Sequence, residues 1–312
     1  MASEIKCNLI VDSCCDLPYD VIDIDGVDLI KFPYIARDGE HADDMFQTIT
    51  AHEFYEGMAK GDMPSTSQVP IPVFKEHFER AIASGVPTVY LSFTSGLSGS
   101  YDVAVMVRDQ LIAEHPDAEL YVVDTLLASV AEGLFVYEAI RQRRHGLTAR
   151  ELVAWAEEAR FYVHELFMVD DLTALARGGR IPASVAFAGS KLNVKPLLDI
   201  DLEGKLSLVG VARGRKKGIH QLAEFYNKRA HNPHERSDHR VMIGNSDCPK
   251  DVERLKEEVI RENETAMFLE SSIGPVIGSH VGPGMLALVY MGEDCREDLT
   301  VSDRIARKVR QK

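Results

Sequence analysis

The sequence predicts an α/β protein of two domains: an N-terminal parallel, Rossmann-like α/β domain and a C-terminal α+β domain with a mainly antiparallel sheet. In the first half, short apolar strands alternate with helices, which is typical of a parallel sheet. The second half instead contains a hairpin, more strands and fewer helices. The length of 312 residues also favours two domains over one. We place the boundary near Val163, which gives domains 1–163 and 164–312.

The first half supplies its elements in order. Asn8–Asp12 is an apolar run that ends in polar residues, so we expect a buried strand. Thr50 and Glu53 form a capping-box pattern before a helix that Gly61 ends. The remaining predictions are a helix from Pro70, a strand at 88–93, a helix at 101–113, a strand at 120–124, a long helix to about 145 and a further helix capped by Thr148 and Glu151.

The second half mixes strands and helices less regularly. Residues 198–211 read as a hairpin that turns at Glu203-Gly204. Further strands are expected at 166–169, 240–243, 266–269 and 285–290, helices near 221 and 252, and a polar loop at 231–238. This mixture predicts a mainly antiparallel sheet.

Composition narrows the possible functions. The 45% hydrophobic and 27% charged residues suit a globular core, and the formal net charge of −14 argues against binding nucleic acid or anionic membranes. The apolar stretch 275–292 is broken by Pro, Gly and His, so we expect no membrane segment. The five scattered cysteines contain no C-x-x-C pair, so we expect no disulfide, no metal site and a cytoplasmic location.

The loop 94–100 (TSGLSGS) is the first candidate site. It lies between a strand and a helix, where hydroxyls and free backbone N–H groups can bind a carboxylate or phosphate. The alternative is a helix cap and tight turn without a ligand. It is not a P-loop, and no G-x-G-x-x-G follows the first strand, so a dinucleotide site is not expected.

Three other segments carry polar groups. Residues 64–68 (PSTSQ) offer hydroxyls, for which capping of the next helix is the simpler interpretation when the segment is taken alone. Arg177-Gly-Gly-Arg180 suits an anion, or alternatively ends a helix with solvated charges. Arg213, Arg215, Lys216 and Lys217 form either a solvated turn or a docking patch for an anionic cofactor on a partner.

His280 lies in the glycine-rich segment 277–284 (IGSHVGPG). Glycines beside a polar side chain indicate a backbone that approaches a ligand or adopts φ > 0. The alternative is a turn whose histidine caps the end of a strand.

Five segments, in the same order along nearly the whole chain, resemble those of the DegV family of bacterial fatty-acid-binding proteins. Each is weak alone, but together they are specific. They are 11–18 (VDSCCDLP), 66–68 (TSQ) followed by Phe74, 95–101 (SGLSGSY), 177–181 (RGGRI) with 192–198 (LNVKPLL), and 277–284.

The resemblance implies an apolar tunnel between the domains that holds one long-chain fatty acid, and no other cofactor. A buried carboxylate needs several donors, because leaving it unpaired is costly. The resemblance assigns that role to Thr66, Ser67, Ser95 and Gly96, with His280 reaching the carboxylate from the second domain.

The resemblance also implies a partner, the ATP-binding catalytic subunit of a fatty acid kinase, which phosphorylates the bound acid to an acyl phosphate. Arg177 is the position expected to face this subunit. The protein itself would then be a non-catalytic, lipid-binding subunit.

Two enzymatic alternatives remain. In a serine hydrolase, Ser95 or Ser98 would be the nucleophile and His280 the base, although the spacing of the loop does not match G-x-S-x-G. A phosphotransferase acting by itself would need a Mg²⁺-binding carboxylate pair beside a phosphate loop, which the sequence does not show.

Overall fold

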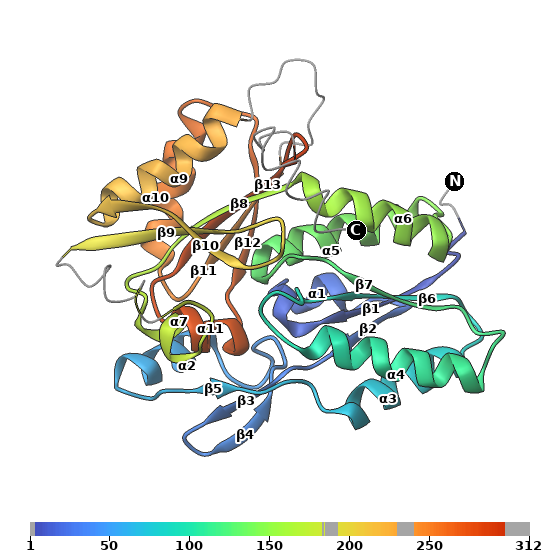
Figure 1. The fold of residues 1–312 in the computed structure, drawn as a ribbon. Coiled ribbons are helices and arrows are strands. Elements are labelled where there is room, and N and C mark those ends of the chain that lie inside the picture. Colours follow the sequence, from blue (N-terminus) through green and yellow to red (C-terminus); the bar gives the residue numbers. More distant parts are fainter. Residues whose placement is uncertain (1–3, 183, 185–192, 230–239, 297–312) are drawn as a thin grey trace.

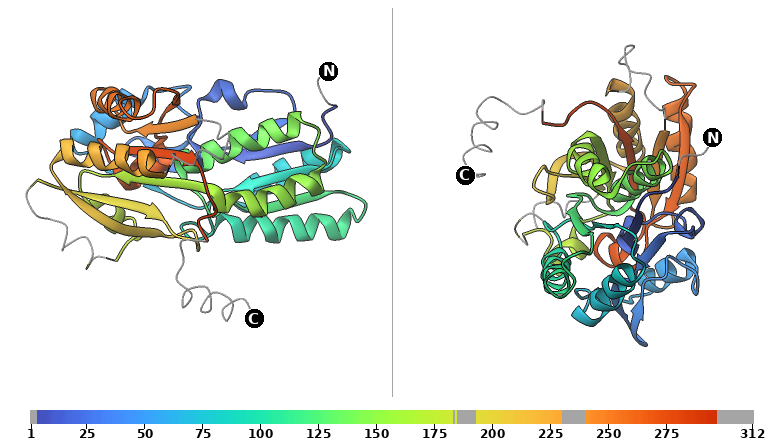
Figure 2. Two further views of the ribbon diagram at one scale, coloured as in Figure 1. Left: turned by 90° about the horizontal axis from the view of Figure 1, so that it is seen from above. Right: turned by 90° about the vertical axis from the view of Figure 1, so that its right-hand side faces the viewer.

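The structure is a computed structural model that describes residues 4–182, 184, 193–229 and 240–296. It confirms the predicted α/β class, with a parallel four-stranded sheet and a separate, mainly antiparallel six-stranded sheet. The two sheets lie side by side along the longer dimension of the molecule (Figures 1 and 2). Leu192 and the predicted polar loop 231–238 lie outside the described residues.

The N-terminal sheet has the order β2-β1-β6-β7, and all its neighbouring strands are parallel. The strands are β1 (Asn8–Asp12), β2 (Val27–Ile30), β6 (Thr88–Ser92) and β7 (Leu120–Asp124). Helices α3 (Ile71–Ala83) and α4 (Ser100–Glu114) pack on one face, and α6 (Ala149–Ala159) packs on the other (Figure 1). All five residues of β6 are buried, as expected for a strand covered on both faces.

Both predicted capping boxes are confirmed. Thr50 caps α2 (Ala51–Ala59), since its side chain accepts from the Glu53 N–H while the Glu53 carboxylate accepts from the Thr50 N–H. Thr148 and Glu151 make the same reciprocal pair at α6. Each pair satisfies backbone donors that the first turn of a helix leaves free.

The C-terminal sheet has the order β10-β9-β8-β13-β11-β12, and in it only β11 and β12 pair in parallel. Helices α9 (Arg215–Arg229) and α10 (Pro249–Ile260) lie together, and α9 packs on the strands. The strands are β8 (Val163–Met168), β9 (Val194–Ile200), β10 (Leu206–Arg213), β11 (Arg240–Asn245), β12 (Met267–Ser272) and β13 (Leu286–Met291).

Helix α5 (Ser129–Arg144) joins the two halves. It packs on β8, β11 and β13 of the C-terminal sheet, and also on the 3-10 helix η1 (Ser13–Cys15) that follows β1. One apolar core therefore contains side chains from both sheets, such as Leu9 and Phe167. The boundary near Val163 stays a prediction, because α5 belongs to the packing of both halves.

Several short elements were not predicted. A small antiparallel sheet consists of β3 (Pro33–Ala36), β4 (Gly39–Ala42) and β5 (Ser65–Thr66). The others are β2 of the parallel sheet, η1 (Ser13–Cys15), α1 (Tyr19–Ile22), η2 (Arg160–Tyr162), α7 (Thr173–Arg177) and α11 (Pro275–Val281). Elements of two to seven residues are too short to show a period in the sequence.

Among the described residues, no helix combines the length and the apolar character that crossing a bilayer requires.

Candidate functional site

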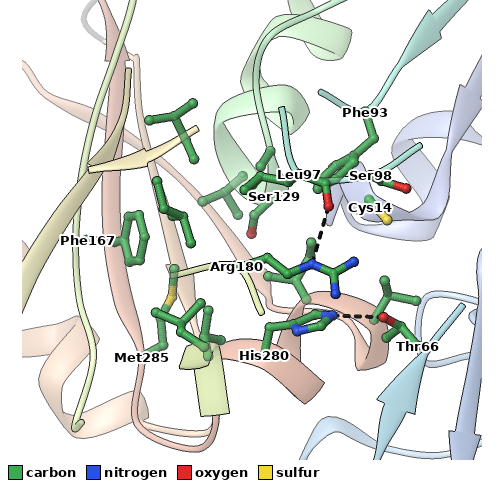
Figure 3. Close-up of a pocket in the computed structure, with 18 of the residues that line it drawn as sticks. Cys14, Thr66, Phe93, Leu97, Ser98, Ser129, Phe167, Arg180, His280 and Met285 are labelled. Carbon is green, nitrogen blue, oxygen red and sulfur yellow. Dashed lines mark hydrogen bonds between the residues drawn. The ribbon is translucent and has the colours of Figure 1, made fainter. Parts of the chain in front are cut away.

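A largely apolar cavity lies between the two sheets, at the carboxyl ends of the parallel strands (Figure 3). The space left unfilled by its side chains is about 730 Å³, counting its opening to solvent. The polar side chains that line it include Thr66, Ser67, Ser98, Ser129, Glu165, Arg180 and His280, and of these Thr66 and His280 contact each other. The apolar lining comes from both halves of the chain and includes Phe32, Phe93, Leu97, Phe167, Leu175, Ile200, Leu206, Val276, Val281 and Met285.

His280 reaches this wall from α11. The helix packs against α7, α2 and β5, so the last turn of α11 points its imidazole toward Thr66 (Figure 3). The alternative of a turn whose histidine caps a strand is therefore wrong: segment 277–284 starts inside a helix. Gly282 (φ 73°) ends that helix with the positive φ that the glycines indicated. A Cβ atom on Gly278 would lie 2.5 Å from the Tyr55 hydroxyl, so this glycine accommodates α2 rather than a ligand.

The imidazole of His280 is only partly satisfied. Its Nε2 lies 2.8 Å from Thr66 Oγ1, whereas its Nδ1 is buried without a hydrogen-bond partner among the described residues. Burial lowers the pKa of His280 to about 4, and the positive charges of Arg180 and Arg177 act in the same direction. The ring is therefore neutral at pH 7.

Arg180 brings a positive charge into the apolar cavity. Its Nε donates to the Leu97 carbonyl (3.3 Å) and its Nη1 donates to the Gly178 carbonyl (2.6 Å). Burial lowers its pKa, yet a guanidinium stays charged at neutral pH. Across the described ranges, no carboxylate forms an ion pair with it. Carbonyl groups orient this cation without neutralising its charge.

The structure brings some of the predicted site residues together and leaves others apart. Thr66, Ser67 and His280 line the cavity, as does Ser98. Ser95 is exposed and absent from the lining, and its N–H donates to Asp124 (3.1 Å). A Cβ atom on Gly96 would lie 2.3 Å from the Gly204 carbonyl oxygen, so Gly96 packs on the β9–β10 turn. This arrangement does not support a carboxylate role for Ser95 and Gly96.

Arg180 was recognised in the sequence only as half of a basic pair, and Arg177 received the functional assignment. The structure places Arg180 in the cavity wall and leaves Arg177 exposed, with its Nη2 donating to the Ser279 carbonyl (3.3 Å). The two arginines differ in their place in the chain, which could have separated them. Arg177 is the last residue of α7, whereas Arg180 follows Gly179, whose positive φ (72°) lies just beyond the helix end.

The geometry does not provide a hydrolase site. His280 bonds Thr66, and the Ser98 hydroxyl instead donates to Ser100 Oγ (3.0 Å) and accepts from the Ser100 N–H (3.2 Å). A histidine that activates a serine must hydrogen-bond that serine, and here His280 contacts neither Ser95 nor Ser98.

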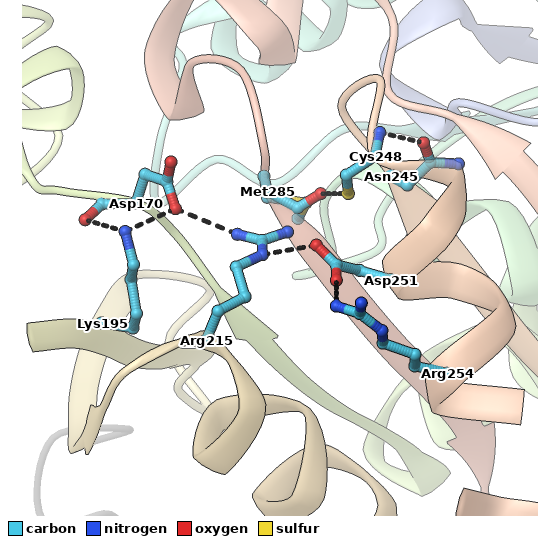
Figure 4. Close-up of polar contacts among 8 residues, drawn as sticks. All are labelled: Asp170, Lys195, Arg215, Asn245, Cys248, Asp251, Arg254 and Met285. Atoms are coloured by element: carbon cyan, nitrogen blue, oxygen red, sulfur yellow. Dashed lines mark hydrogen bonds and ion pairs between the residues drawn. The ribbon is translucent and has the colours of Figure 1, made fainter. Parts of the chain in front are cut away.

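The basic cluster at 213–217 is divided by the fold. Arg215 donates to Asp251 (2.6 Å) and to Asp170 (3.0 Å), and Lys195 pairs with the same Asp170 at 2.8 Å (Figure 4). Arg213, Lys216 and Lys217 are exposed. Arg215 is therefore not available to dock an anionic cofactor, because its charge is already paired with Asp251 and Asp170.

A model of the DegV family, described as an uncharacterised protein family, matches residues 6–293. The chain belongs to the DegV family. Among curated relatives, a DegV domain-containing protein of Clostridium perfringens is 35% identical over 285 residues, which cover 91% of this chain and 97% of the relative. The recognition made from five sequence segments is thus confirmed.

Solved DegV structures share the whole fold. A DegV lipid-binding protein of Thermotoga maritima is 28% identical with a TM-score of 0.78, covering 93% of this chain and 99% of its own. A fatty-acid-binding DegV family protein of Thermus thermophilus is also 28% identical, with a TM-score of 0.80 and coverage of 92% and 100%.

Proposed function

We propose that this DegV protein binds one long-chain fatty acid in the cavity between its sheets, with the carboxylate against Arg180. The observation that carries the proposal is a guanidinium that lies in an apolar cavity without a carboxylate partner in the described chain. A bound carboxylate would supply the missing negative charge and accept hydrogen bonds from the guanidinium N–H groups. The lipid and fatty acid ligands of the DegV relatives point to the same ligand class.

The hydroxyl of Thr66 completes the head-group site. A neutral imidazole has one N–H donor and one acceptor nitrogen. If Nε2 carries the proton, it donates to Thr66 Oγ1 and leaves the threonine O–H free to donate to the carboxylate. The buried Nδ1 then holds no unpaired proton. Thr66 and Arg180 thus act as donors, whereas His280 orients Thr66 and takes up no proton.

The acyl chain would lie along the apolar wall that Phe167, Leu206 and Met285 form with their neighbours. Each methylene buried there contributes about 0.8 kcal/mol. The tail therefore supplies most of the affinity, and the head group fixes which end of the ligand enters.

The second part of the proposal concerns a partner. We propose that the protein presents the carboxylate to the ATP-binding catalytic subunit of a fatty acid kinase, which phosphorylates it to an acyl phosphate. Arg177 supports this role, because it is exposed one turn of chain away from Arg180. A kinase subunit that approached the carboxylate end of the cavity would meet the positive charge of Arg177.

Native mass spectrometry of the purified protein tests the lipid-binding part. We expect the mass of one fatty acid above that of the chain, and uptake of palmitic acid after delipidation. A protein that carries no acyl chain and takes up none would contradict the proposal.

The Arg177→Met variant tests the partner part. It should bind palmitic acid like the wild type but be a poor substrate when a fatty acid kinase catalytic subunit and ATP are added. Arg261, which is exposed at the end of α10, offers a matched control, since Arg261→Met should change neither readout. Normal phosphorylation of the acid bound to Arg177→Met would remove the docking role.

A further inference from the structure

One polar group in the cavity has no role in binding a carboxylate. Glu165 lines the cavity from β8, among Phe167, Ile200 and Leu206, and its Oε1 is buried without a hydrogen-bond partner among the described residues. An apolar residue at this position of β8 would suit a plain hydrocarbon chain better than a glutamate does. The glutamate therefore calls for an explanation.

The register of the sheet separates Glu165 from the head-group site. Phe167 pairs with Ala287, and Glu165 lies two residues farther along the same face of β8, opposite Val289. The strand advances about 3.3 Å per residue, so Glu165 lies roughly 6.6 Å beyond Phe167. Because β8 leads at its other end to α7, this displacement is away from Arg180. Glu165 would meet the acyl chain and not its carboxylate.

The carboxyl group at this position is a hydrogen-bond donor at neutral pH. Burial raises the pKa of Glu165 to about 8, the charge of Asp199 adds to this, and a hydrogen bond from the Ile200 N–H opposes it. A protonated carboxyl group offers one O–H and a carbonyl oxygen. Oε1 has no hydrogen-bond partner among the described residues, and a buried polar atom left unpaired destabilises the protein. A saturated or unsaturated hydrocarbon chain offers nothing to pair with them.

We infer that the cavity prefers a long-chain acid that carries a hydroxyl or keto oxygen along its chain, and that Glu165 binds this oxygen. The inference rests on the proposed function, since it concerns the tail of the same ligand. A hydroxyl can donate to Oε1 and accept from the carboxyl proton, so it pairs both groups at once. A site with such a group binds an analogue that lacks the hydroxyl less tightly, because the carboxyl group of Glu165 is then left unpaired.

The test is a binding series with matched ligands. The affinity of the delipidated protein is measured for stearic acid and for a set of hydroxystearic acids in which the hydroxyl moves along the chain to its end. One hydroxyl position should bind about 10-fold tighter than stearic acid, the ratio that one buried hydrogen bond produces. Positions on either side should bind more weakly than stearic acid, because their hydroxyl is buried unpaired.

Two variants show whether Glu165 causes the preference. Glu165→Gln keeps a donor and an acceptor, so the preferred hydroxyl position should stay preferred. Glu165→Leu should bind stearic acid at least as well as the wild type and should lose the preference for the hydroxylated acid. Because the readout is a ratio of two ligands within each protein, a general loss of stability in either variant does not mimic it.

The outcomes separate this inference from the proposed function. If stearic acid binds and no hydroxyl position improves on it, the inference fails, Glu165 holds water only, and the fatty-acid function stands. A preference that persists in Glu165→Leu also overturns it. If neither stearic acid nor any hydroxylated acid binds the wild type, the proposed function itself fails.

Discussion

The polar groups buried at the two ends of α11 differ in how far the chain itself supplies their hydrogen-bond partners. At its start, the Gly274 N–H donates to Asp16 Oδ1 (2.8 Å) and the Val276 N–H donates to Asp43 Oδ2 (3.4 Å). Both carboxyl groups are buried and have further donors, from Ser129 (2.6 Å) and the Met45 N–H (3.0 Å). At its end, His280 lies beside a guanidinium that has no such counterpart in the described chain.

The difference separates buried polar groups that stabilise the fold from those that we propose contact a ligand. Asp16 and Asp43 accept hydrogen bonds from donors within the chain, so these bonds stabilise the folded protein without a ligand. Among the described residues, Arg180 has no carboxylate partner and His280 Nδ1 has no hydrogen-bond partner, and we propose that the bound fatty acid pairs with Arg180. Substitutions at the start of α11 should therefore affect stability, and those at its end should affect binding.

The largest expected effect is at the start of the helix. Asp16→Ala leaves the Gly274 N–H and the Ser129 hydroxyl buried without an acceptor, so the free energy of unfolding should fall by about 3 kcal/mol. Chemical denaturation measures this value. Asp16→Asn is the matched control, because asparagine keeps an acceptor oxygen and tolerates the left-handed conformation at this position (φ 48°). Equal losses in the two variants would show that the hydrogen bonds are not the cause.

The pH dependence should have opposite signs at the two ends. The pKa of His280 is lowered to about 4, so between pH 4 and 6.5 the unfolded chain holds a proton that the folded protein lacks, and stability rises with pH. Burial raises the pKa of Asp43 to about 7, so between pH 3.8 and 7 the folded protein holds the extra proton, and stability falls as pH rises.

Unfolding curves between pH 4.5 and 6.5 check both signs. Relative to the wild type, His280→Asn should lose stability as the pH rises and Asp43→Asn should gain it, each by up to about 1.4 kcal/mol per pH unit. Parallel curves for all three proteins would contradict the two shifts.

The smallest effects come from two adjacent glycines. A Cβ atom on Gly178 would lie 2.2 Å from His280 Nδ1, so Gly178→Ala should displace the imidazole and weaken fatty acid binding about 10-fold. A Cβ atom on Gly179 would meet nothing within 4 Å, but its φ of 72° disfavours alanine. Gly179→Ala should cost about 1 kcal/mol of stability and leave binding unchanged. Titration and denaturation of both variants would show whether the two effects separate.

The sequence predicted most strands of the two larger sheets and the long helices, because their period or their caps are local. Thr50 with Glu53 marks a helix start within four residues. It also predicted Thr66, Ser67 and His280, which line the cavity. It could not show that Ser95 is exposed while Ser98 lines the cavity, since a serine in a strand-to-helix loop carries no sign of which way it faces. The loop turns Ser98 toward the cavity, because Gly96 packs against the β9–β10 turn more than a hundred residues later.

Glu165 could not be recognised from the sequence for a similar reason. One glutamate in an apolar run reads as the solvent-facing residue of a strand. In the fold, α5 packs on β8, and residues of α5, β9 and β10 line the cavity together with Glu165, so the side chain becomes part of a cavity wall. Long-range packing decided its environment.

The carboxylate role of Arg180 is tested by comparing the binding of palmitic acid with that of the alcohol of the same chain length, in the wild type and in Arg180→Met. Competition against a fluorescent acyl probe gives the four affinities. The wild type should bind the acid about 100-fold more tightly than the alcohol, because hydrogen bonds to a charged partner contribute about 1.5–3 kcal/mol. In Arg180→Met the two ligands should bind within a few-fold of each other, with little change in unfolding. An undiminished preference for the acid in Arg180→Met, or none in the wild type, would show that Arg180 does not receive the carboxylate.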